Sequence, residues 1–212
     1  MMTTKLAWKN IWRNKTRSLV FIGSAILGFA MALFTLNLMK AISGQRLSDA
    51  INIETSYIQV HKAGFIENKG VNETITSEKE LVSLLESIPE IENYSQRIVA
   101  EAVIASPENT IGVELLGVIP EKENARSALC DFLLQGQWLP EEASTPILLS
   151  KKNAKKLNLT LGSKVIITLQ ASDGQITGGA FWVAGIFTTP STPFNEGKVL
   201  VNYSDLKNLV NI

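Results

Sequence analysis

The longest apolar stretch of the chain runs from Leu19 to Met39, 21 positions without a charged side chain. At about 1.5 Å of rise per residue it would form a helix of roughly 30 Å, the thickness of the hydrocarbon core of a bilayer. The pattern therefore predicts a transmembrane helix at residues 19–39. A cleaved secretory signal is the alternative, because Ala30-Met31-Ala32 offers a cleavage motif. Since the apolar run continues past that motif and exceeds the usual length of about 7–15 residues, we expect a retained anchor.

The two sides of this span differ in charge. Residues 1–39 hold five basic and no acidic side chains, whereas residues 40–212 hold 15 basic and 20 acidic ones, so the net charges are +5 and −5. Lys and Arg beside a span favour the cytoplasmic side of a membrane. We therefore expect the N-terminus in the cytoplasm and residues 40–212 outside it.

Residues 1–18 predict a basic amphipathic helix on the cytoplasmic side. Apolar residues recur there at helical spacing, and the basic residues lie on the other face. Two roles stay open: an interfacial anchor, which composition alone favours, or a coupling helix that contacts a soluble partner. The candidate residues are Lys5, Trp8, Lys9, Trp12, Arg13, Lys15 and Arg17.

Small residues recur at every fourth position within the predicted span, at Ser24, Gly28 and Ala32. Because packing drives helix association in lipid, small residues at this spacing let a second helix approach closely. The three residues therefore predict a helix-packing face, and the neighbouring helices would have to come from outside this chain.

After the span the pattern predicts a helical stalk at residues 40–54 and a mixed α/β domain at residues 55–212. Strands are expected at 55–61, 94–105, 110–119, 147–149, 164–169, 176–188 and 198–203. Helices are expected at 77–88, opened by the capping box Ser77-Glu78-Lys79-Glu80, at 151–157, and at the C-terminus from Ser204 or Asp205. Residues 121–139 are predicted irregular or partly helical and 189–197 a loop. The predicted fold class is α+β.

The residue types offer little chemistry. His61 is the only histidine and Cys130 the only cysteine, so the chain lacks the residues for a histidine metal cluster, a disulfide or a cysteine zinc site. No G-x-x-x-x-G-K-[ST] phosphate loop occurs. We therefore predict no catalytic, cofactor-binding or metal residue and no enzymatic activity. Lys151, Lys152, Lys155 and Lys156 are predicted to face solvent on a short helix, and the acidic domain argues against nucleic acid as a partner.

Three segments, in the same order, resemble bacterial ABC transporter permeases of the FtsX/MacB/LolC-LolE superfamily. The first is the basic segment Leu6–Leu19, which in that family precedes the first span. The second is the strand–helix–strand segment Ile147–Ile167. The third is Phe181–Phe187 with the returning strand and helix at Val199–Leu206.

This resemblance implies both an architecture and a mechanism. Family members have a MacB-like periplasmic core domain, with porter-like and sabre-like parts, between the first two of generally four spans. Two permeases, which are two copies or two paralogues, assemble with two cytosolic ABC ATPase subunits in the cell inner membrane. ATP hydrolysis then moves the periplasmic domains by mechanotransmission, and the clients include lipoproteins and peptides. The resemblance implies no cofactor.

The chain departs from the family pattern because it ends at Ile212 after one span. We expect an N-terminal fragment with an incomplete core domain, since a returning strand at 199–206 would leave a sheet unfinished, and a short relative is the alternative. Two other functions stay open. One is a single-span anchored extracytoplasmic binding module, and the other is a membrane-anchored enzyme, for which the sequence offers no constellation.

Overall fold

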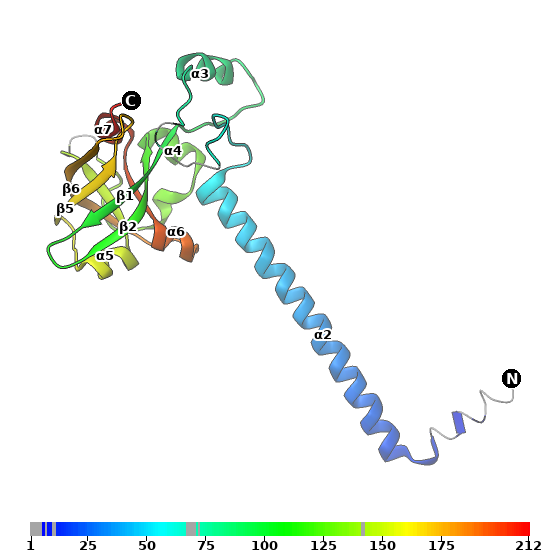
Figure 1. Cartoon of the computed structure of the whole chain (residues 1–212). Coiled ribbons are helices and arrows are strands. Elements are labelled where there is room, and N and C mark those ends of the chain that lie inside the picture. Colours follow the sequence, from blue (N-terminus) through cyan, green and yellow to red (C-terminus); the bar gives the residue numbers. More distant parts are fainter. Residues whose placement is uncertain (1–5, 7, 10–11, 67–70, 72, 141–142) are drawn as a thin grey trace. The chain divides into compact units, whose positions relative to one another are not determined.

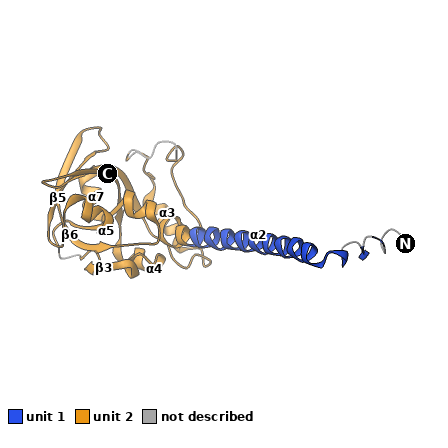
Figure 2. Cartoon of the chain, turned by 90° about the horizontal axis from the view of Figure 1, so that it is seen from below, with its two compact units in different colours: residues 1–48 blue, residues 49–212 orange. Residues whose placement is uncertain are grey.

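The computed structural model of the chain describes residues 6, 8–9, 12–66, 71, 73–140 and 143–212 (Figure 1). The chain divides into two compact units, Met1–Ser48 and Asp49–Ile212 (Figure 2). The second unit, called the domain below, begins at Asp49, earlier in the chain than the predicted boundary at residue 55.

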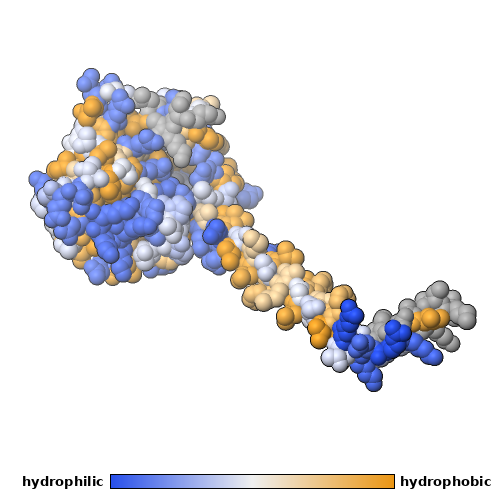
Figure 3. All heavy atoms as spheres, turned by 60° about the horizontal axis from the view of Figure 1, so that its bottom comes forward, coloured by the Kyte–Doolittle hydropathy of each residue, from blue (hydrophilic) through white to orange (hydrophobic). Residues whose placement is uncertain are grey.

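The main element of the first unit is helix α2, Lys15–Asp49, which has no buried residue. Counted together with the π-helical turn that follows it, this is one helix of 41 residues, long and apolar enough to cross a membrane. Apolar residues cover much of its length in Figure 3. Its few polar side chains bond to carbonyls of their own helix, as Thr35 Oγ1 does to Met31 O at 2.9 Å and Asn37 Nδ2 to Leu33 O at 2.8 Å. Such internal pairing suits a helix in lipid, where water cannot satisfy polar groups.

Six strands of the domain pair in a closed ring. The ring order is β1-β2-β7-β4-β6-β5, and β5 pairs again with β1; β3 adds to β6 outside the ring. Every ring strand pairs with a neighbour on each side along part of its length, so the sheet closes on itself. The strands are β1 Arg97–Ala105, β2 Thr110–Val118, β3 Leu133–Gly136, β4 Pro146–Ser150, β5 Lys164–Gln170, β6 Ile176–Phe187 and β7 Lys198–Asn202.

The topology of the ring repeats itself once. The succession of two antiparallel strands, a helix, a strand and a helix occurs as β1-β2-α4-β4-α5, with η2 and β3 inserted before β4, and again as β5-β6-α6-β7-α7. The pairings repeat too, since β2 runs parallel to β7 as β6 does to β4. The helices are α4 Pro120–Arg126, α5 Lys151–Leu157, α6 Thr192–Gly197 and α7 Tyr203–Val210. Both α5 and α7 follow their strand directly and end at a left-handed asparagine, Asn158 or Asn211.

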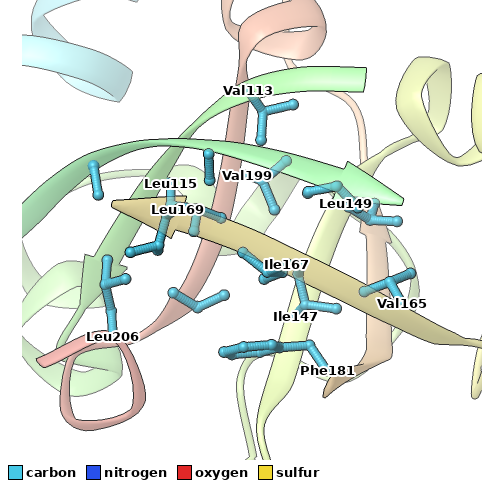
Figure 4. Packing of buried hydrophobic residues seen from close by; sticks show 14 of the residues in the cluster. Val113, Leu115, Ile147, Leu149, Val165, Ile167, Leu169, Phe181, Val199 and Leu206 are labelled. Atoms are coloured by element: carbon cyan, nitrogen blue, oxygen red, sulfur yellow. The ribbon is translucent and has the colours of Figure 1, made fainter. Parts of the chain in front are cut away.

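Apolar side chains fill the interior of the ring. Alternate residues of β1 and β5 point inward, and the helices α5 and α7 add Leu157 and Leu206 to the same cluster (Figure 4). Strands β4 and β7 are buried on both faces, which explains their continuous apolar runs. Their outward side chains Leu148 and Leu200 belong to a second cluster, which also takes in Phe194 of α6.

Several predicted elements are correct: the strands β1, β2, β5 and β6, the strand–helix pair β4–α5, and the strand–helix pair β7–α7. Residues 121–139, predicted irregular or partly helical, hold α4, the 3-10 turn η2 (Leu129–Phe132) and β3. Residues 40–54, predicted as a helical stalk, are helical throughout. Strand β7 has β2 and β4 on its two sides, so the sheet is not left open there, contrary to the expectation from residues 199–206.

The predicted strand at 55–61 is wrong. Ala50–Thr55 forms a π-helical turn, η1, and the chain leaves it at Ser56 with φ 62°. The side chains of Tyr57, Ile58 and Val60 are all exposed. Alternation alone does not make a strand, because a strand needs a partner for its backbone groups, and residues 55–61 pair with none of the described strands.

Three smaller predictions also need correction. The predicted loop at 189–197 contains helix α6, which Ser191 caps by accepting from the backbone N–H of Phe194. The capping box at Ser77 does not form, since helix α3, Glu78–Glu86, has no side-chain cap. Helix α7 begins after Asn202, before the predicted caps Ser204 and Asp205.

Candidate functional site

The candidate site lies where the turn η1 contacts the closed ring of six strands, called the barrel below. We call it the η1 site and define it as Ile53 and Glu54 of η1, Arg97 of β1, Glu123 of α4 and Lys198 of β7. The first two residues come from the turn that directly follows α2 in the chain, and the other three come from the barrel and its covering helix.

Ile53 is the apolar contact of the site. Its side chain is 2% exposed and belongs to the cluster on the outer face of β2 and β7, with Leu116, Val118 and Leu200. Full burial of an isoleucine side chain stabilises a fold by about 1.5–3 kcal/mol. Ile53 thus attaches η1 to the same cluster that holds helix α6 against the barrel.

Arg97 binds the end of η1 through its guanidinium group. Nη1 donates to the carbonyl oxygen of Glu54 at 2.6 Å, and Nη2 donates to that of Ile53 at 3.3 Å. The last carbonyls of a helix have no partner within the helix, and a cationic donor there is favourable. Arg97 therefore replaces the missing helical hydrogen bonds and fixes where the turn ends.

Glu123 holds Arg97 in place from the other side. Arg97 donates to it through Nη2 at 2.5 Å and Nε at 3.0 Å, a bidentate pair. The carboxylate is fully buried and also accepts from Arg126 Nη2, Ser127 Oγ and Ser95 Oγ, each at 2.8 Å.

The pKa of Glu123 reflects this environment. Burial by itself raises the pKa of the carboxyl, but the hydrogen bond and charge of Arg97, together with Arg126, outweigh it and lower the pKa to about 2. Glu123 is thus ionised at neutral pH. Loss of either partner of a buried ion pair leaves an uncompensated charge, which is strongly destabilising.

Lys198 adds a second ionic contact. Its Nζ lies 2.6 Å from Glu54 Oε1 and 2.8 Å from Glu114 Oε1, so it joins η1 to β2 and β7. The η1 site is therefore held by one apolar, two backbone and two ionic contacts. This arrangement suits mechanical attachment of the turn to the barrel.

A second feature of the domain is an open groove of about 450 Å³ beside helix α3. Val60, Ile75, Leu81 and Leu84 supply its apolar lining. Hydrogen bonds hold both ends of α3 beside the groove. Glu78 accepts one from Tyr203 Oη at 2.8 Å, and Glu86 accepts one from Tyr94 Oη at 2.5 Å. None of the described residues of 55–96 is buried, so helix α3 is fixed by the polar contacts at its two ends.

The predicted site residues lie mostly on the first unit. Lys5 is outside the described residues, while Trp8, Lys9, Trp12 and Arg13 are helical. The Trp8 and Trp12 rings meet edge to face, with centroids 6.1 Å apart. Lys15 and Arg17 lie in the first turn of α2, and Ser24, Gly28 and Ala32 lie exposed farther along it. Their roles as interfacial residues and as a packing face stay predictions.

Sequence reasoning missed the η1 site. Glu123 belongs to a run of acidic and basic residues, Pro120–Arg126, that is typical of a solvated helix. Its partner Arg97 is 26 positions away and its role depends on the ring that brings β1 beside α4. Among the described residues no group of three or more His, Cys, Asp or Glu could hold a metal ion.

No protein-family model matches the chain, and no curated protein matches it. In structure, the chain is similar to the extracellular domain of the noncanonic ABC-type transporter YknZ from Gram-positive bacteria. The TM-score is 0.47 at 17% sequence identity, and the match covers 63% of this chain and 66% of that chain, slightly less than two thirds.

Proposed function

We propose that this chain is a permease subunit, or the N-terminal part of one, of an ABC transporter of the MacB/LolC-E/FtsX type. The domain lies in the periplasm, and the N-terminus lies on the cytoplasmic side of the inner membrane. A cytosolic ABC ATPase subunit and a second permease copy or paralogue complete the assembly. ATP hydrolysis moves the domain, and the clients are lipoproteins or peptides that are released or exported.

The η1 site is the observation that carries this proposal. The turn that directly follows the candidate span ends on Arg97, and Arg97 is held in turn by the buried Glu123. A displacement of η1 against the barrel would break two backbone hydrogen bonds and expose Ile53. Because these hydrogen bonds and the burial of Ile53 would all be lost together, the barrel follows the turn as one body. Such an attachment is what mechanotransmission requires.

The predictions made for the span and for the basic residues before it support the same assembly. The small residues Ser24, Gly28 and Ala32 provide a face on which other spans pack. A Cβ added at Gly28 would meet no atom within 4 Å in the described part of the chain, so this face is open to a neighbouring helix. The basic residues before the span contact lipid headgroups or the ATPase.

Purification of the tagged full chain from its native membranes tests the proposal. We expect an ABC ATPase subunit to co-purify and its ATPase activity to change when Arg97 is replaced by Ala. The matched control is Lys79→Ala, because Lys79 is an exposed cation on α3 with no ion pair among the described residues. Purification without any ATPase subunit would contradict the proposal.

The groove beside α3 favours a second candidate, the single-span anchored binding module. The exposed side chain of Val60 lines it, Tyr57 and Ile58 are exposed just before it in the chain, and exposed apolar surface marks binding sites. A binding module would capture its partner with no ATPase present and without response to ATP. Loss of capture in Leu84→Glu, with retention in Arg97→Ala, would favour this function over transport.

A further inference from the structure

Helix α5 concentrates positive charge on a domain that is otherwise acidic. Residues 49–212 contain 13 basic and 20 acidic residues, which gives a net charge of −7. Four of those 13 basic residues lie within six positions of α5, at Lys151, Lys152, Lys155 and Lys156. All four are exposed. We call them the α5 lysine face.

Most other described basic residues of the domain are neutralised within it. Arg97 and Arg126 pair with Glu123, Lys198 with Glu54 and Glu114, and Lys207 with Glu78. On α5 only Lys152 forms an ion pair, with Glu196. Lys151, Lys155 and Lys156 form none with the described residues, although the charge of Lys156 lowers the pKa of Glu196. The α5 lysine face is therefore available for external anions.

The opposite side of α5 holds this face rigidly. Ala154 and Leu157 are buried in the barrel core, and Asn153 is fully buried beneath the helix. Ser150 caps the helix by accepting from Asn153 N at 3.0 Å, and it donates to the carbonyl of Asn195 in α6. Since lysines 151 and 155, like 152 and 156, are one turn apart, the four ammonium groups project from one outward surface. Helix α5 lies at the lower edge of the domain in Figure 1, and Figure 3 turns that edge forward and shows a hydrophilic area there.

The chemistry of this face fits a surface of phosphate groups. Lysine is depleted from the cores of protein interfaces, and α5 exposes no aromatic or large apolar side chain that could anchor a protein partner. Clustered lysines bind anionic headgroups through additive electrostatic attraction. The candidate membrane span belongs to the same chain, so a tethered domain meets headgroups at high effective concentration.

We propose that the α5 lysine face binds the anionic headgroups of the membrane in which the chain is anchored. Binding would set the orientation of the domain on the membrane. The proposal depends on the membrane anchor and not on transport. Each lysine near an anionic surface favours the docked state by about fivefold, so three lysines favour it by roughly 100-fold.

Fluorescence energy transfer to labelled headgroups tests this in the full chain, embedded in nanodiscs of phosphatidylcholine alone or mixed with phosphatidylglycerol. A dye at Thr160→Cys, in a Cys130→Ser background, reports on the α5 end of the barrel. A dye at Gln175→Cys, beyond the far end of β5, is the matched control. Both positions are exposed. We expect phosphatidylglycerol to raise transfer from position 160 and not from position 175.

The variant K151Q/K152Q/K155Q/K156Q should abolish this rise, as should molar salt, which shortens the Debye length to about 3 Å. An unchanged thermal unfolding midpoint verifies that the variant folds. Equal transfer in both lipid mixtures, or a rise that persists in the quadruple variant, would overturn the proposal. Binding of soluble polyphosphate without any lipid-dependent transfer would also overturn it, because the phosphate source would then not be the membrane.

Discussion

Glu123 shows how one buried charge organises a large part of the domain. Its carboxylate accepts five hydrogen bonds, from Arg97 twice and from Arg126, Ser127 and Ser95 once each. Through Arg97 these bonds extend to the last carbonyls of η1. A single side chain therefore connects β1, α4 and η1, three elements that are far apart in sequence.

Replacing Glu123 by Gln should destabilise the domain strongly. The amide keeps the size of the side chain but leaves Arg97 and Arg126 without a counter-charge in a buried position. Breaking a buried ion pair in this way costs about 3–5 kcal/mol. Glu121→Gln is the matched control, because Glu121 is exposed two residues earlier on the same helix, and should change stability by about 0.5 kcal/mol or less. Urea unfolding of the chain in detergent micelles, followed by tryptophan fluorescence, measures both.

The stability of the domain should fall in acid because of the same carboxyl. The pKa of Glu123 is about 2 in the folded state, below its ordinary value of 4.5. The unfolded state therefore binds the proton first, so stability is fully present above pH 4.5 and is lost as the pH falls toward 2. The pKa of Glu78 is also lowered, chiefly by the hydrogen bond from Tyr203, and acts in the same direction.

The measurement is the urea midpoint of the wild type and of Glu123→Gln between neutral pH and pH 3. Between neutral pH and pH 3 the carboxyl titrates over about 1.5 of the units that separate its unfolded and folded pKa, so at about 1.4 kcal/mol per unit Glu123 contributes about 2 kcal/mol of the loss. The wild type should lose stability steeply, and the variant should show a flatter profile. Parallel profiles for the two proteins would show that Glu123 does not carry the acid sensitivity.

At the scale of elements, the turn η1 decides how the chain passes from the candidate span into the domain. It widens the helix to π geometry at Ala50–Thr55 and places Ile53 inward. π-Helical turns are rare and occur frequently at functional sites. The attachment of η1 depends as much on this apolar side chain as on Arg97.

Replacing Ile53 by Ala should detach the turn. The loss of a buried isoleucine costs about 2–5 kcal/mol, because the lost apolar contacts and the cavity both count. Ile58→Ala is the control, since Ile58 is 82% exposed and its truncation should have little effect. Hydrogen exchange of the backbone amides measures the result: exchange at residues 52–56 should accelerate in Ile53→Ala and stay unchanged in Ile58→Ala. Equal exchange in the two variants would contradict the role given to Ile53.

Local patterns predicted the elements whose sequence signals are strong. The sequence of Ile147–Leu157 indicates strand β4 and helix α5 directly, because an apolar run that is buried on both faces is followed by Ser150, which caps the helix. The pattern failed at residues 55–61, where Tyr57, Ile58 and Val60 are exposed and the segment pairs with none of the described strands. It also could not reveal the contacts of Arg97 and Glu123, since these depend on ring closure between distant strands.

At the scale of the whole molecule, the two units suit different surroundings. The first unit has a helix without a buried residue, which fits a membrane-anchored protein. The second has its own closed barrel and core, and it holds all of the acidic residues of the chain. A chain divided in this way is expected to orient by its basic flank.

The central claim is that α2 crosses a bilayer with the acidic domain outside the cytosol. In a Cys130→Ser background, single cysteines at Thr16 and Gln175 test it by labelling of intact cells with a membrane-impermeant maleimide. Both residues are exposed and lie on opposite sides of the span in sequence. The account predicts that position 175 reacts in intact cells and that position 16 reacts only after permeabilisation. Labelling of position 16 alone in intact cells, or protection of both positions, would contradict it.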